Sequence, residues 1–521
     1  MKREDNINLL KTTPFLWDFI VIGGGATGLG IAVDAASRGF KTVLLEQLDF
    51  AKMTSGRSTK LVHGGIRYLQ NGDIGLVLEA LRERGILRRN APHLVRPQRF
   101  IVANYFWWEK PFYTIGLIIY DLLAGKRGLG RSFPMNKKQA IKAIPQITQK
   151  GLRGGVTYYD CQFDDSRMAV NLMQTAGEQG ATVVNYAMVI DVLKNDGKVS
   201  GVTVRDEISG NTFDLKGRCI VNATGILVDQ IIQMDNINEA PLVRPSQGIH
   251  LVVDRSFLGG DDAIMIPKTS DGRILFGIPW HDRLILGTTD TPVKEFVLDP
   301  KPLQEEIDFV LNTSSAYLTR PPKREDVLCI YAGLRPLAAP KRNMNNKKTK
   351  EISRRHKLIV STSGLITITG GKWTTYRQMA QETVDLGIKQ CGLPSKKCVT
   401  KDLQIHGYHP TTDFRNRRHV YGSDDEKIQT LQNKNPGYAK KLHPSFDFTV
   451  AEIIWAVREE MAITVEDVLS RRIRALILDA RAAIEMAPKV AHIMACELGK
   501  EEAWEKEQVV VFEELAKGYL I

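Results

Sequence analysis

The clearest pattern of hydrophobic and polar positions lies close to the N-terminus. Residues 17–22 (WDFIVI) form a short, mostly apolar run, which predicts a buried parallel strand. A glycine-rich turn, 23–28, comes next, and the small residues of 29–38 predict a helix. Residues 41–45 (KTVLL) predict a second strand, which leads directly to Glu46. This order of strand, glycine turn, helix, strand and acid is typical of a Rossmann-type dinucleotide-binding unit.

Each of the three spaced glycines in the turn is expected to have a separate structural role. Gly23 permits the tight turn, Gly25 lets the backbone approach a pyrophosphate, and Gly28 lets the helix pack closely on the strand. The helix N-terminus presents N–H groups to the phosphates, and the acid that follows the second strand is positioned to accept hydrogen bonds from ribose hydroxyls. The residues expected to bind the cofactor here are Gly23, Gly25, Ala26, Thr27, Gly28 and Glu46.

Three further segments favour FAD over NAD as the cofactor. Residues 54–68 (TSGRSTKLVHGGIRY) form a polar loop that can follow the pyrophosphate and pass under an isoalloxazine ring. Residues 220–225 (IVNATG) predict a strand whose final turn closes over the adenine end. Residues 366–377 (ITITGGKWTTYR) predict a helix start that faces the flavin pyrimidine edge. The residues expected to contact FAD in these segments are Thr54, Ser55, Ser58, Lys60, Leu61, His63, Gly64, Gly65, Ala223, Thr224, Gly225, Gly371, Lys372, Trp373 and Thr374.

One apolar run outside this pattern, residues 112–123 (FYTIGLIIYDLL), is open to two interpretations. It is either a buried helix or an interfacial anchor, since Trp107 and Trp108 precede it and basic residues flank it. No run reaches the ~18 uninterrupted apolar residues typical of a membrane-spanning helix. The first fifteen residues also lack the apolar core of a signal peptide, so we expect neither feature.

The length of the chain and its C-terminal pattern indicate more than one domain. A chain of 521 residues is too long for one compact core. Residues 389–401, which contain glycine, proline and several lysines, predict a linker. Beyond the linker, Val450, Ile453 and Val457 recur at helical spacing and predict a helical C-terminal region.

Charge and cysteine content restrict the partners and the compartment. The formal charge of +12 suits anionic substrates and acidic membrane surfaces better than nucleic acid, because no nucleic-acid-binding motif is recognisable. Much of the excess positive charge lies between Lys341 and Lys357. This stretch is either a solvated loop or a loop from which individual basic residues reach a site. The six cysteines include no CxxC pair, which argues against a disulfide scaffold or zinc site and favours a reduced, cytosolic setting.

Several stretches are specific in combination, above all HGGIRYL, GTTDT and GGKWTTYR. With VIGGGATGLGIAVDAASRG, APHLVRP, FDDSRMAVNL, VNATG, QGIHLVV and AGLRPL they extend over most of the chain. The C-terminal stretches YGSDDEKI and WAVREEMAITVEDVLSRRIRA continue the match. On these motifs the chain resembles the FAD-dependent glycerol-3-phosphate dehydrogenases, the flavoprotein type rather than the soluble nicotinamide type.

The resemblance implies an α/β fold in which a Rossmann-type FAD-binding domain is joined to a D-amino-acid-oxidase-like substrate domain with a mixed or antiparallel sheet. The FAD-dependent oxidoreductase part would span 15–395. Its FAD domain would be assembled from about 15–95, 150–240 and 325–390, with the substrate domain built from the intervening segments. A helical C-terminal domain, 400–521, would complete the chain.

The resemblance also implies a reaction, the oxidation of sn-glycerol 3-phosphate to dihydroxyacetone phosphate by hydride transfer from C2 to flavin N5. Such a site needs cations for the phosphate and an acceptor for the hydroxyl proton. Arg335 and Arg67 occupy positions that line the substrate pocket in this family, and Arg354 is a third candidate. His250 is the expected base, and Lys372 would place positive charge near the flavin or the developing oxyanion. A lysine base, with His250 orienting the alcohol, is the alternative.

The partners follow from the same resemblance. The implied electron acceptor is a membrane quinone, which would make this a cytoplasmic enzyme bound peripherally to the inner face of the membrane. We expect no nucleic acid partner, and the sequence leaves a homodimer open. Three alternatives remain: a glycerol-3-phosphate oxidase that uses O₂, a flavoenzyme of the same fold acting on an amino acid or amine, and an FAD-binding or tRNA-modification-type protein whose basic surface meets RNA.

Overall fold

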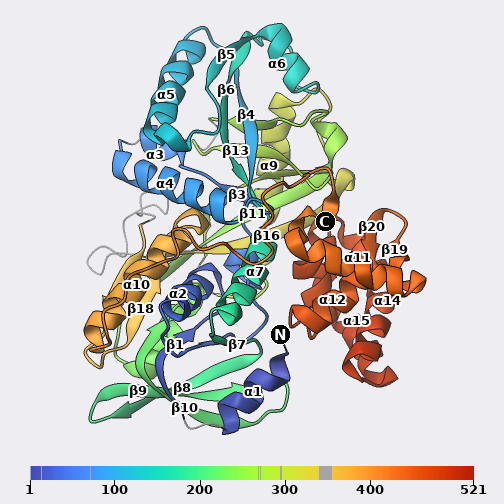
Figure 1. Cartoon of the computed structure of the whole chain (residues 1–521). Helices are drawn as coiled ribbons and strands as arrows, with labels where there is room; N and C mark the ends of the chain where they lie inside the picture. The colour runs from blue at the N-terminus through green and yellow to red at the C-terminus, as the bar shows by residue number, and fades with distance from the viewer. Residues whose placement is uncertain are drawn as a thin grey trace.

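The computed structural model describes residues 2–12, 15–70, 72–267, 269, 272–293, 296–338 and 355–521, apart from the side chains of Arg67 and Gln70. Within these residues the chain forms two large β-sheets and a helical C-terminal region (Figure 1). The first sheet lies in the lower part of that view, the second in the upper part, and the C-terminal helices lie at the right.

The first sheet is parallel at its centre and has the strand order β17-β18-β10-β1-β2-β7. Strand β1 runs between β10 and β2, parallel to both, and the antiparallel β8–β9 hairpin pairs with the first half of β10. The last four residues of β1 and all of β2 are buried, as expected for central strands covered on both faces. The strands are β1 Leu16–Ile22, β2 Thr42–Leu45, β7 Thr182–Val184, β8 Ala187–Asn195, β9 Lys198–Asp206, β10 Thr212–Asn222, β17 Lys357–Val360 and β18 Ile366–Thr369.

Helices cover both faces of this sheet. Helix α2 packs between α7 and α10, and Leu29 and Ala32 of α2 share a buried cluster with Phe19 and Leu44 of the strands. The other face is covered by α1, α8 and the β8–β9 hairpin. The predicted βαβ unit is thereby confirmed as β1, α2 and β2. The helices are α1 Arg3–Thr12, α2 Ala26–Ser37, α7 Asp165–Glu178, α8 Val228–Asp235 and α10 Tyr376–Gln390.

The second sheet is mixed, as expected for the substrate side of the fold. Its order is β15-β11-β14-β13-β12-β4-β6-β3, with β16 paired to β11 and β5 paired to β6. Only β4 and β12 run parallel among its described strand pairs. The strands are β3 Leu61–Val62, β4 Arg96–Asn104, β5 Phe133–Asn136, β6 Gly154–Gln162, β11 Val243–Asp254, β12 Ala263–Ile266, β13 Leu275–Trp280, β14 Arg283–Gly287, β15 Thr291–Pro292 and β16 Val327–Ala338. The helices around it are α3 Ile66–Gln70, α4 Ile74–Asn90, α5 Glu109–Ala124, α6 Lys137–Ala143 and α9 Gln304–Tyr317.

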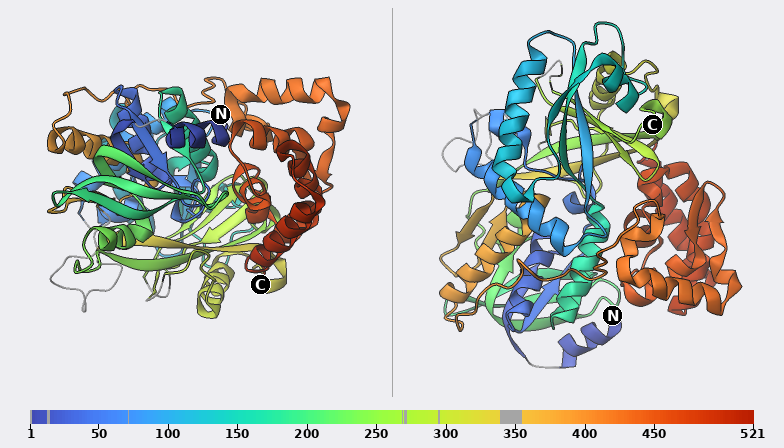
Figure 2. Two further views of the ribbon diagram at one scale, coloured as in Figure 1. Left: turned by 90° about the horizontal axis from the view of Figure 1, so that it is seen from below. Right: turned by 45° about the horizontal axis from the view of Figure 1, so that its top comes forward.

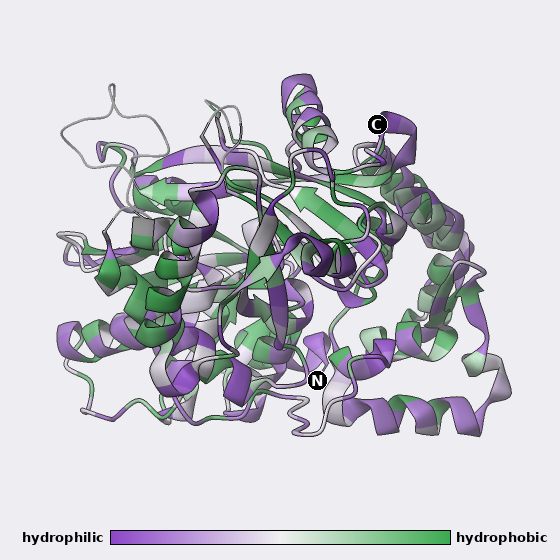
Figure 3. Ribbon diagram, turned by 90° about the horizontal axis from the view of Figure 1, so that it is seen from above, coloured by the Kyte–Doolittle hydropathy of each residue, from purple (hydrophilic) through white to green (hydrophobic). Residues whose placement is uncertain are grey.

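The strands of the two sheets alternate along the chain. Strands β3, β6 and β16 lie in ranges predicted for the FAD domain, yet they pair within the second sheet. The limits of the FAD and substrate domains therefore stay a prediction. In Figure 3 the strands of both sheets are predominantly hydrophobic, and hydrophilic positions gather on the outer helices.

The C-terminal region is helical, as predicted, apart from a small β-hairpin. It lies against the body formed by the two sheets in each view of Figure 2. Buried ion pairs join it to that body: Arg167 of α7 donates two hydrogen bonds of 2.7 Å to Glu460, and Arg472 donates two to Asp49. Its elements are α11 Asp425–Lys434, β19 Lys441–His443, β20 Phe446–Thr449, α12 Val450–Glu459, η10 Asp467–Arg472, α13 Ala475–Leu478, α14 Ala480–Leu498 and α15 Glu502–Lys517.

Candidate active site

The turn between β1 and α2 has the geometry that its glycines predict. Gly23 has φ +108°, a conformation that favours glycine. A Cβ on Gly28 would lie 1.9 Å from the Gly23 carbonyl oxygen, so glycine alone fits where α2 begins. The N-cap residue Gly25 has no side chain to cap the helix, which leaves the positive end of α2 available to an anion.

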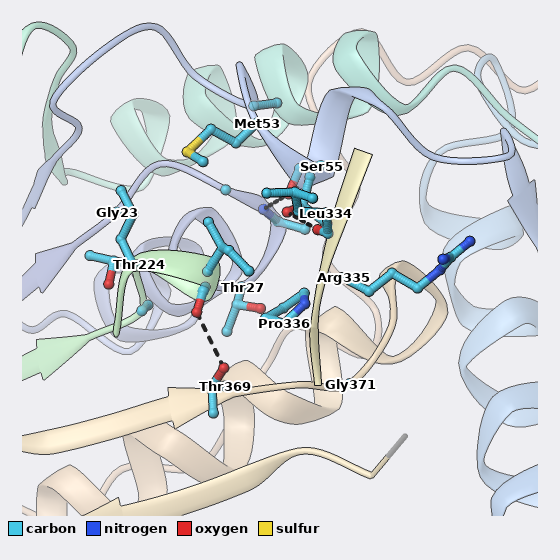
Figure 4. A pocket seen from close by; sticks show the side chains of 18 of the residues that line it. Gly23, Thr27, Met53, Ser55, Thr224, Leu334, Arg335, Pro336, Thr369 and Gly371 are labelled. Atoms are coloured by element: carbon cyan, nitrogen blue, oxygen red, sulfur yellow. Dashed lines mark hydrogen bonds between the residues drawn. The ribbon is translucent and has the colours of Figure 1, made fainter. Parts of the chain in front are cut away.

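A cavity of about 320 Å³ begins at this turn and reaches the second sheet. Figure 4 shows Gly23, Thr27 and Thr224 on one side of it and Gly371 on another, while the side chain of Arg335 extends away from the glycine turn. All four segments predicted from the sequence contribute to its wall. The predicted site residues that line it are Gly23, Gly25, Ala26, Thr27, Glu46, Thr54, Ser55, Ser58, Leu61, His63, Ala223, Thr224, Gly225, His250, Arg335, Gly371, Lys372, Trp373 and Thr374.

Hydrogen bonds hold the walls near the turn together. Glu46 accepts from the backbone N–H groups of Gly24 at 2.5 Å and Leu48 at 2.9 Å, and burial raises the pKa of its carboxyl group. Ser55 Oγ accepts from the Ala26 N–H at 3.0 Å. The indole N–H of Trp373 donates to the Ser55 carbonyl at 2.8 Å, which connects the loop after β2 to the turn after β18.

Lys60 is placed differently from the prediction. Its ammonium group is completely buried and lies 2.6 Å from Asp165 Oδ2, and it also donates to the Gly56 carbonyl. Burial lowers the pKa of this lysine to about 8, against the opposing effect of Asp165. The lysine does not line the cavity, because this ion pair holds its side chain beneath the loop that contains Ser58.

The remaining predicted residues fall into two groups. Gly28, Gly64 and Gly65 are described but do not line the cavity. Gly28 instead supports the helix–turn contact, and the Gly64 N–H donates to the Tyr120 hydroxyl at 2.8 Å. The side chain of Arg67 and the whole of Arg354 lie outside the described residues.

His250 lies on β11, which pairs with β14 on one side and with β16 on the other, near one edge of the second sheet. It is opposite Tyr331 of β16 and Gly287 of β14, and its ring stacks on Tyr331 with centroids 4.8 Å apart. Nε2 lies 2.9 Å from Thr59 Oγ1, and Nδ1 has no hydrogen-bond partner among the described residues. Burial lowers the pKa of His250 well below its ordinary value, and the charges of Lys60 and Arg335 lower it further. The imidazole is therefore neutral near pH 7.

Arg335 lies on β16 beside β11 and is largely held by neutral acceptors. It donates to the Thr288 hydroxyl at 3.0 Å, to the carbonyls of Thr289 and Gln247 at 3.0 and 3.2 Å, and lies 3.5 Å from Asp290. These contacts fix the plane of its guanidinium group at the cavity wall, where it can meet an anion.

Gly248 makes room for this arginine. A Cβ at that position would lie 2.3 Å from Arg335 Nη2. Lys372, at the opposite segment, places its Nζ 3.8 Å from the centroid of the Tyr68 ring. The cavity thus has cationic side chains on two of its walls.

Sequence reasoning missed several wall residues. Thr59 cannot be identified from the sequence, because nothing in TSGRSTKLVH distinguishes the hydroxyl that contacts His250. Tyr68 stands next to Arg67 in the motif GGIRYL, which is the one signal that marks it. Leu334 and Thr369 line the cavity and hold its loops, since the Leu334 carbonyl accepts from Thr54 and Thr369 donates to the Gly225 carbonyl.

The donor set of this cavity fits FAD. The open N-terminus of α2 suits the pyrophosphate, the carboxylate of Glu46 suits ribose hydroxyls, and Lys372 suits the negative charge that a reduced flavin develops. The fold and this cavity define an FAD-dependent oxidoreductase. In agreement, the family model described as FAD dependent oxidoreductase matches residues 18–377, and that of the C-terminal domain of alpha-glycerophosphate oxidase matches residues 362–508.

The chain belongs to the FAD-dependent glycerol-3-phosphate dehydrogenase family, and FAD is its cofactor. It is 39% identical over 537 residues to the probable mitochondrial glycerol-3-phosphate dehydrogenase of Caenorhabditis elegans, covering 96% of this chain and 73% of the relative. It is 37% identical over 543 residues to the mitochondrial glycerol-3-phosphate dehydrogenase of Mus musculus, covering 97% and 74%.

Solved structures agree with this assignment. The FAD complex of the glycerol-3-phosphate dehydrogenase from Bacillus halodurans has a TM-score of 0.81 and 28% identity, covering 99% of this chain and 97% of that one. The glycine oxidase of Geobacillus kaustophilus, at 16% identity and a TM-score of 0.54 over 74% of this chain, shares the fold alone.

Proposed function

We propose that the protein oxidises sn-glycerol 3-phosphate to dihydroxyacetone phosphate and passes the electrons to a membrane quinone. The observation that carries the substrate assignment is the pairing of a neutral, buried histidine, His250, with Arg335 on the neighbouring strand of the same cavity wall. A secondary alcohol that carries a phosphate needs both a proton acceptor and a cation. Relatives named glycerol-3-phosphate dehydrogenase support the same substrate.

His250 accepts the proton of the C2 hydroxyl in this proposal. The stacked Tyr331 ring and the hydrogen bond with Thr59 hold the imidazole in place, and burial keeps it neutral and able to accept a proton. Arg335 binds the phosphate group, since its fork is already oriented by Thr288 and by backbone carbonyls. FAD, when bound, supplies the hydride acceptor. Arg67 and Arg354 stay proposed contributors to the phosphate site.

Helix α5 supports the membrane part of the proposal. Its inner face packs Tyr113, Leu117 and Tyr120 into the protein. Its outer face exposes a set of large apolar side chains, continued by the aromatic residues before the helix: Phe106, Trp107, Trp108, Phe112, Ile115, Ile118, Ile119 and Leu122. A continuous apolar surface of this kind, beginning with aromatic residues, suits insertion into the interface of a lipid bilayer. The exposure of these side chains favours an interfacial anchor over a buried helix for residues 112–123.

The same helix is fastened to the active-site loop. The Tyr120 hydroxyl accepts from the Gly64 N–H and donates to Asp160, and Gly64 is adjacent to His63 in the cavity wall. A lipid-soluble quinone at α5 would therefore approach the cavity from the membrane side.

No helix among the described residues has the length and apolar character needed to cross a bilayer, so we propose attachment from one side. Peripheral attachment to the inner, cytoplasmic face of a membrane stays part of the proposal. The curated relatives are named as mitochondrial enzymes.

Initial rates with different donors and acceptors test this function. The FAD-loaded protein is assayed with sn-glycerol 3-phosphate, glycerol, or glycine as donor, and with a soluble quinone under argon or with air as acceptor. We expect turnover with glycerol 3-phosphate and quinone alone. Fast turnover of glycine would move the protein to the amino-acid flavoenzymes, and stoichiometric hydrogen peroxide without quinone would make it an oxidase.

A further inference from the structure

A second cavity, about 650 Å³ in volume, lies between the second sheet and the C-terminal region. Its walls come from the start of β4, the start of α7, the segment between β11 and β12, the β13–β14 turn and three stretches of the C-terminal region. None of the predicted cofactor or catalytic residues that the structure describes lines it. Arginine is the most frequent residue in its wall, although neither the reaction nor the cofactor accounts for a second cationic cavity.

Most of these arginines are structural. Arg167 pairs with Glu460, Arg472 with Asp49, Arg474 with Asp165, Arg417 with Glu452, Arg99 with Asp262 and Arg415 with Asp413. The pairs of Arg167, Arg472 and Arg474 join the C-terminal region to the rest of the protein, and all six pairs leave little charge to attract a ligand.

Arg96 and Arg283 differ from the rest. Within the described part of the chain, neither guanidinium group has a carboxylate oxygen within 4.0 Å. Arg96 donates two hydrogen bonds, of 2.9 and 2.6 Å, to the side-chain oxygen of Gln162. Burial lowers the pKa of Arg96, and the nearby Arg255 adds to the effect while Asp282 opposes it.

The second arginine is also held by neutral groups. Arg283 donates to the carbonyls of Leu478 and Asp282, each at 3.3 Å, and its guanidinium lies 5.3 Å from the centroid of the Phe446 ring. Neutral acceptors orient a guanidinium group without cancelling its charge. Arg96 and Arg283 therefore keep their attraction for an anion.

Two imidazole rings add to the polar lining near Arg96. His281 and His419 stack with centroids 6.1 Å apart and planes 9° apart. His419 Nδ1 lies 2.8 Å from the His93 carbonyl, so this nitrogen carries a proton, and burial lowers the pKa of the ring to about 4. Phe414 packs against the His419 ring and under the Arg96 guanidinium, which holds both in one cluster.

The acids of the cavity wall are already engaged. Asp262 pairs with Arg99, Asp282 and Asp261 with Arg255, and Asp447 with Lys441. Asp164 lies 3.6 Å from His281 and 3.5 Å from Arg474. Among the arginines that line the cavity, Arg96 and Arg283 are the two without a carboxylate oxygen within 4.0 Å in the described part of the chain.

We propose that this second cavity binds a phosphate group, free or as a monoester, through Arg96 and Arg283. Guanidinium groups donate paired, charge-assisted hydrogen bonds that match phosphate oxygens. The site is separate from the substrate pocket, because the two cavities share no lining residue. The proposal does not depend on the proposed substrate, since it rests on the second cavity alone.

Calorimetric titration of the FAD-loaded protein with inorganic phosphate tests the site. The Arg335→Ala variant removes the expected phosphate contact of the active site, and we expect it to retain one saturable phosphate site. Adding Arg283→Gln or Arg96→Gln should weaken that site by about tenfold or more. Arg415→Gln is the matched control, since Arg415 lines the same cavity but is exposed and paired with Asp413, and it should leave the affinity unchanged.

Two results would overturn the proposal: no saturable phosphate binding in the Arg335→Ala protein, or equal affinity with and without Arg96 and Arg283. Visible absorbance of bound flavin verifies that each variant is folded. Should Arg96→Gln fail to fold because the hydrogen bonds to Gln162 are lost, Arg283→Gln gives the same test by itself. Titration with glycerol 2-phosphate distinguishes the sources: tighter binding than inorganic phosphate identifies a monoester site, and weaker binding a site for the free ion.

Discussion

The hydroxyl of Thr59 lies 2.9 Å from Nε2 of His250, and this contact joins the loop after the glycine unit to strand β11 of the second sheet. Thr59 precedes the buried Lys60–Asp165 ion pair, while His250 is stacked on Tyr331. The histidine is consequently held from two sides at the end of the FAD cavity. A proton acceptor fixed in this way loses little freedom when substrate binds, which is the arrangement that acid–base catalysis favours.

Replacing His250 with asparagine should lower kcat for sn-glycerol 3-phosphate by about 10²- to 10⁴-fold, because the proton acceptor is removed while the side-chain volume changes little. Flavin content should stay at the wild-type level. Steady-state rates with an electron-accepting dye measure the effect. His492→Asn, at an exposed position on α14, is the matched control and should leave kcat unchanged. Wild-type kcat in the His250 variant would transfer the role of base to another residue, Lys372 being the alternative.

Arg335→Ala should raise KM for sn-glycerol 3-phosphate strongly while FAD stays bound. Loss of one charged hydrogen-bonding partner in a desolvated site corresponds to about 2–5 kcal/mol. The arginine is oriented by Thr288 and Thr289, so Arg335→Lys should rescue the KM only in part, because lysine keeps the charge without the fork. An unchanged KM in the alanine variant would remove Arg335 from the phosphate site.

The glycine turn and the strands around it could be predicted from the sequence because their causes are local. Gly23 and Gly28 are required by a backbone angle and by one close contact within six residues of chain. Lys60 could not be placed in the same way, since its partner Asp165 is 105 residues away and burial decides which groups pair. Thr59 and His250 meet across 191 residues, and no local pattern indicates that contact.

Helix α5 illustrates the same limit for surfaces. Composition gave residues 112–123 equal weight as a buried helix and as an anchor, since an apolar run does not say which of its faces the rest of the chain covers. Tertiary packing covers Leu117 and Tyr120 and leaves Ile115 and Leu122 exposed. The predicted phosphate ligands Arg67 and Arg354 stay predictions, because their side chains lie outside the described residues.

Glutamate substitutions on the outer face of α5 should release the protein from membranes. Each large apolar side chain withdrawn from the bilayer interface removes up to about 1.5–3 kcal/mol of binding. Ile115→Glu combined with Leu122→Glu should therefore abolish co-sedimentation with vesicles of a neutral and an acidic phospholipid, while activity with a soluble dye persists. Val510→Glu, on the exposed side of α15, is the matched control. Co-sedimentation that survives the double substitution would place the membrane contact elsewhere.

His406 gives the fold a pH dependence of defined sign. Burial alone would lower its pKa, but hydrogen bonds to Asp424 and Glu178 outweigh burial and raise the pKa from 6.5 to about 9. Protonated His406 therefore stabilises the folded state fully below pH 6.5, and this contribution is lost as the pH rises through 9. The difference corresponds to about 3 kcal/mol.

Thermal unfolding midpoints measured between pH 6.5 and pH 9 should fall for the wild type and change less for His406→Gln. The substitution keeps a polar side chain of similar size but has no proton to lose in this range. Parallel loss of stability in the two proteins would assign the pH dependence to other groups.

The most direct test of the central claim is anaerobic mixing of the FAD-loaded protein with sn-glycerol 3-phosphate, while the visible absorbance of the flavin is followed. The account predicts rapid bleaching of the flavin band, with dihydroxyacetone phosphate formed in equal amount, and return of the colour when quinone is added. A flavin that stays oxidised with glycerol 3-phosphate but bleaches with an amino acid would contradict the proposed substrate and leave the fold and the cofactor standing.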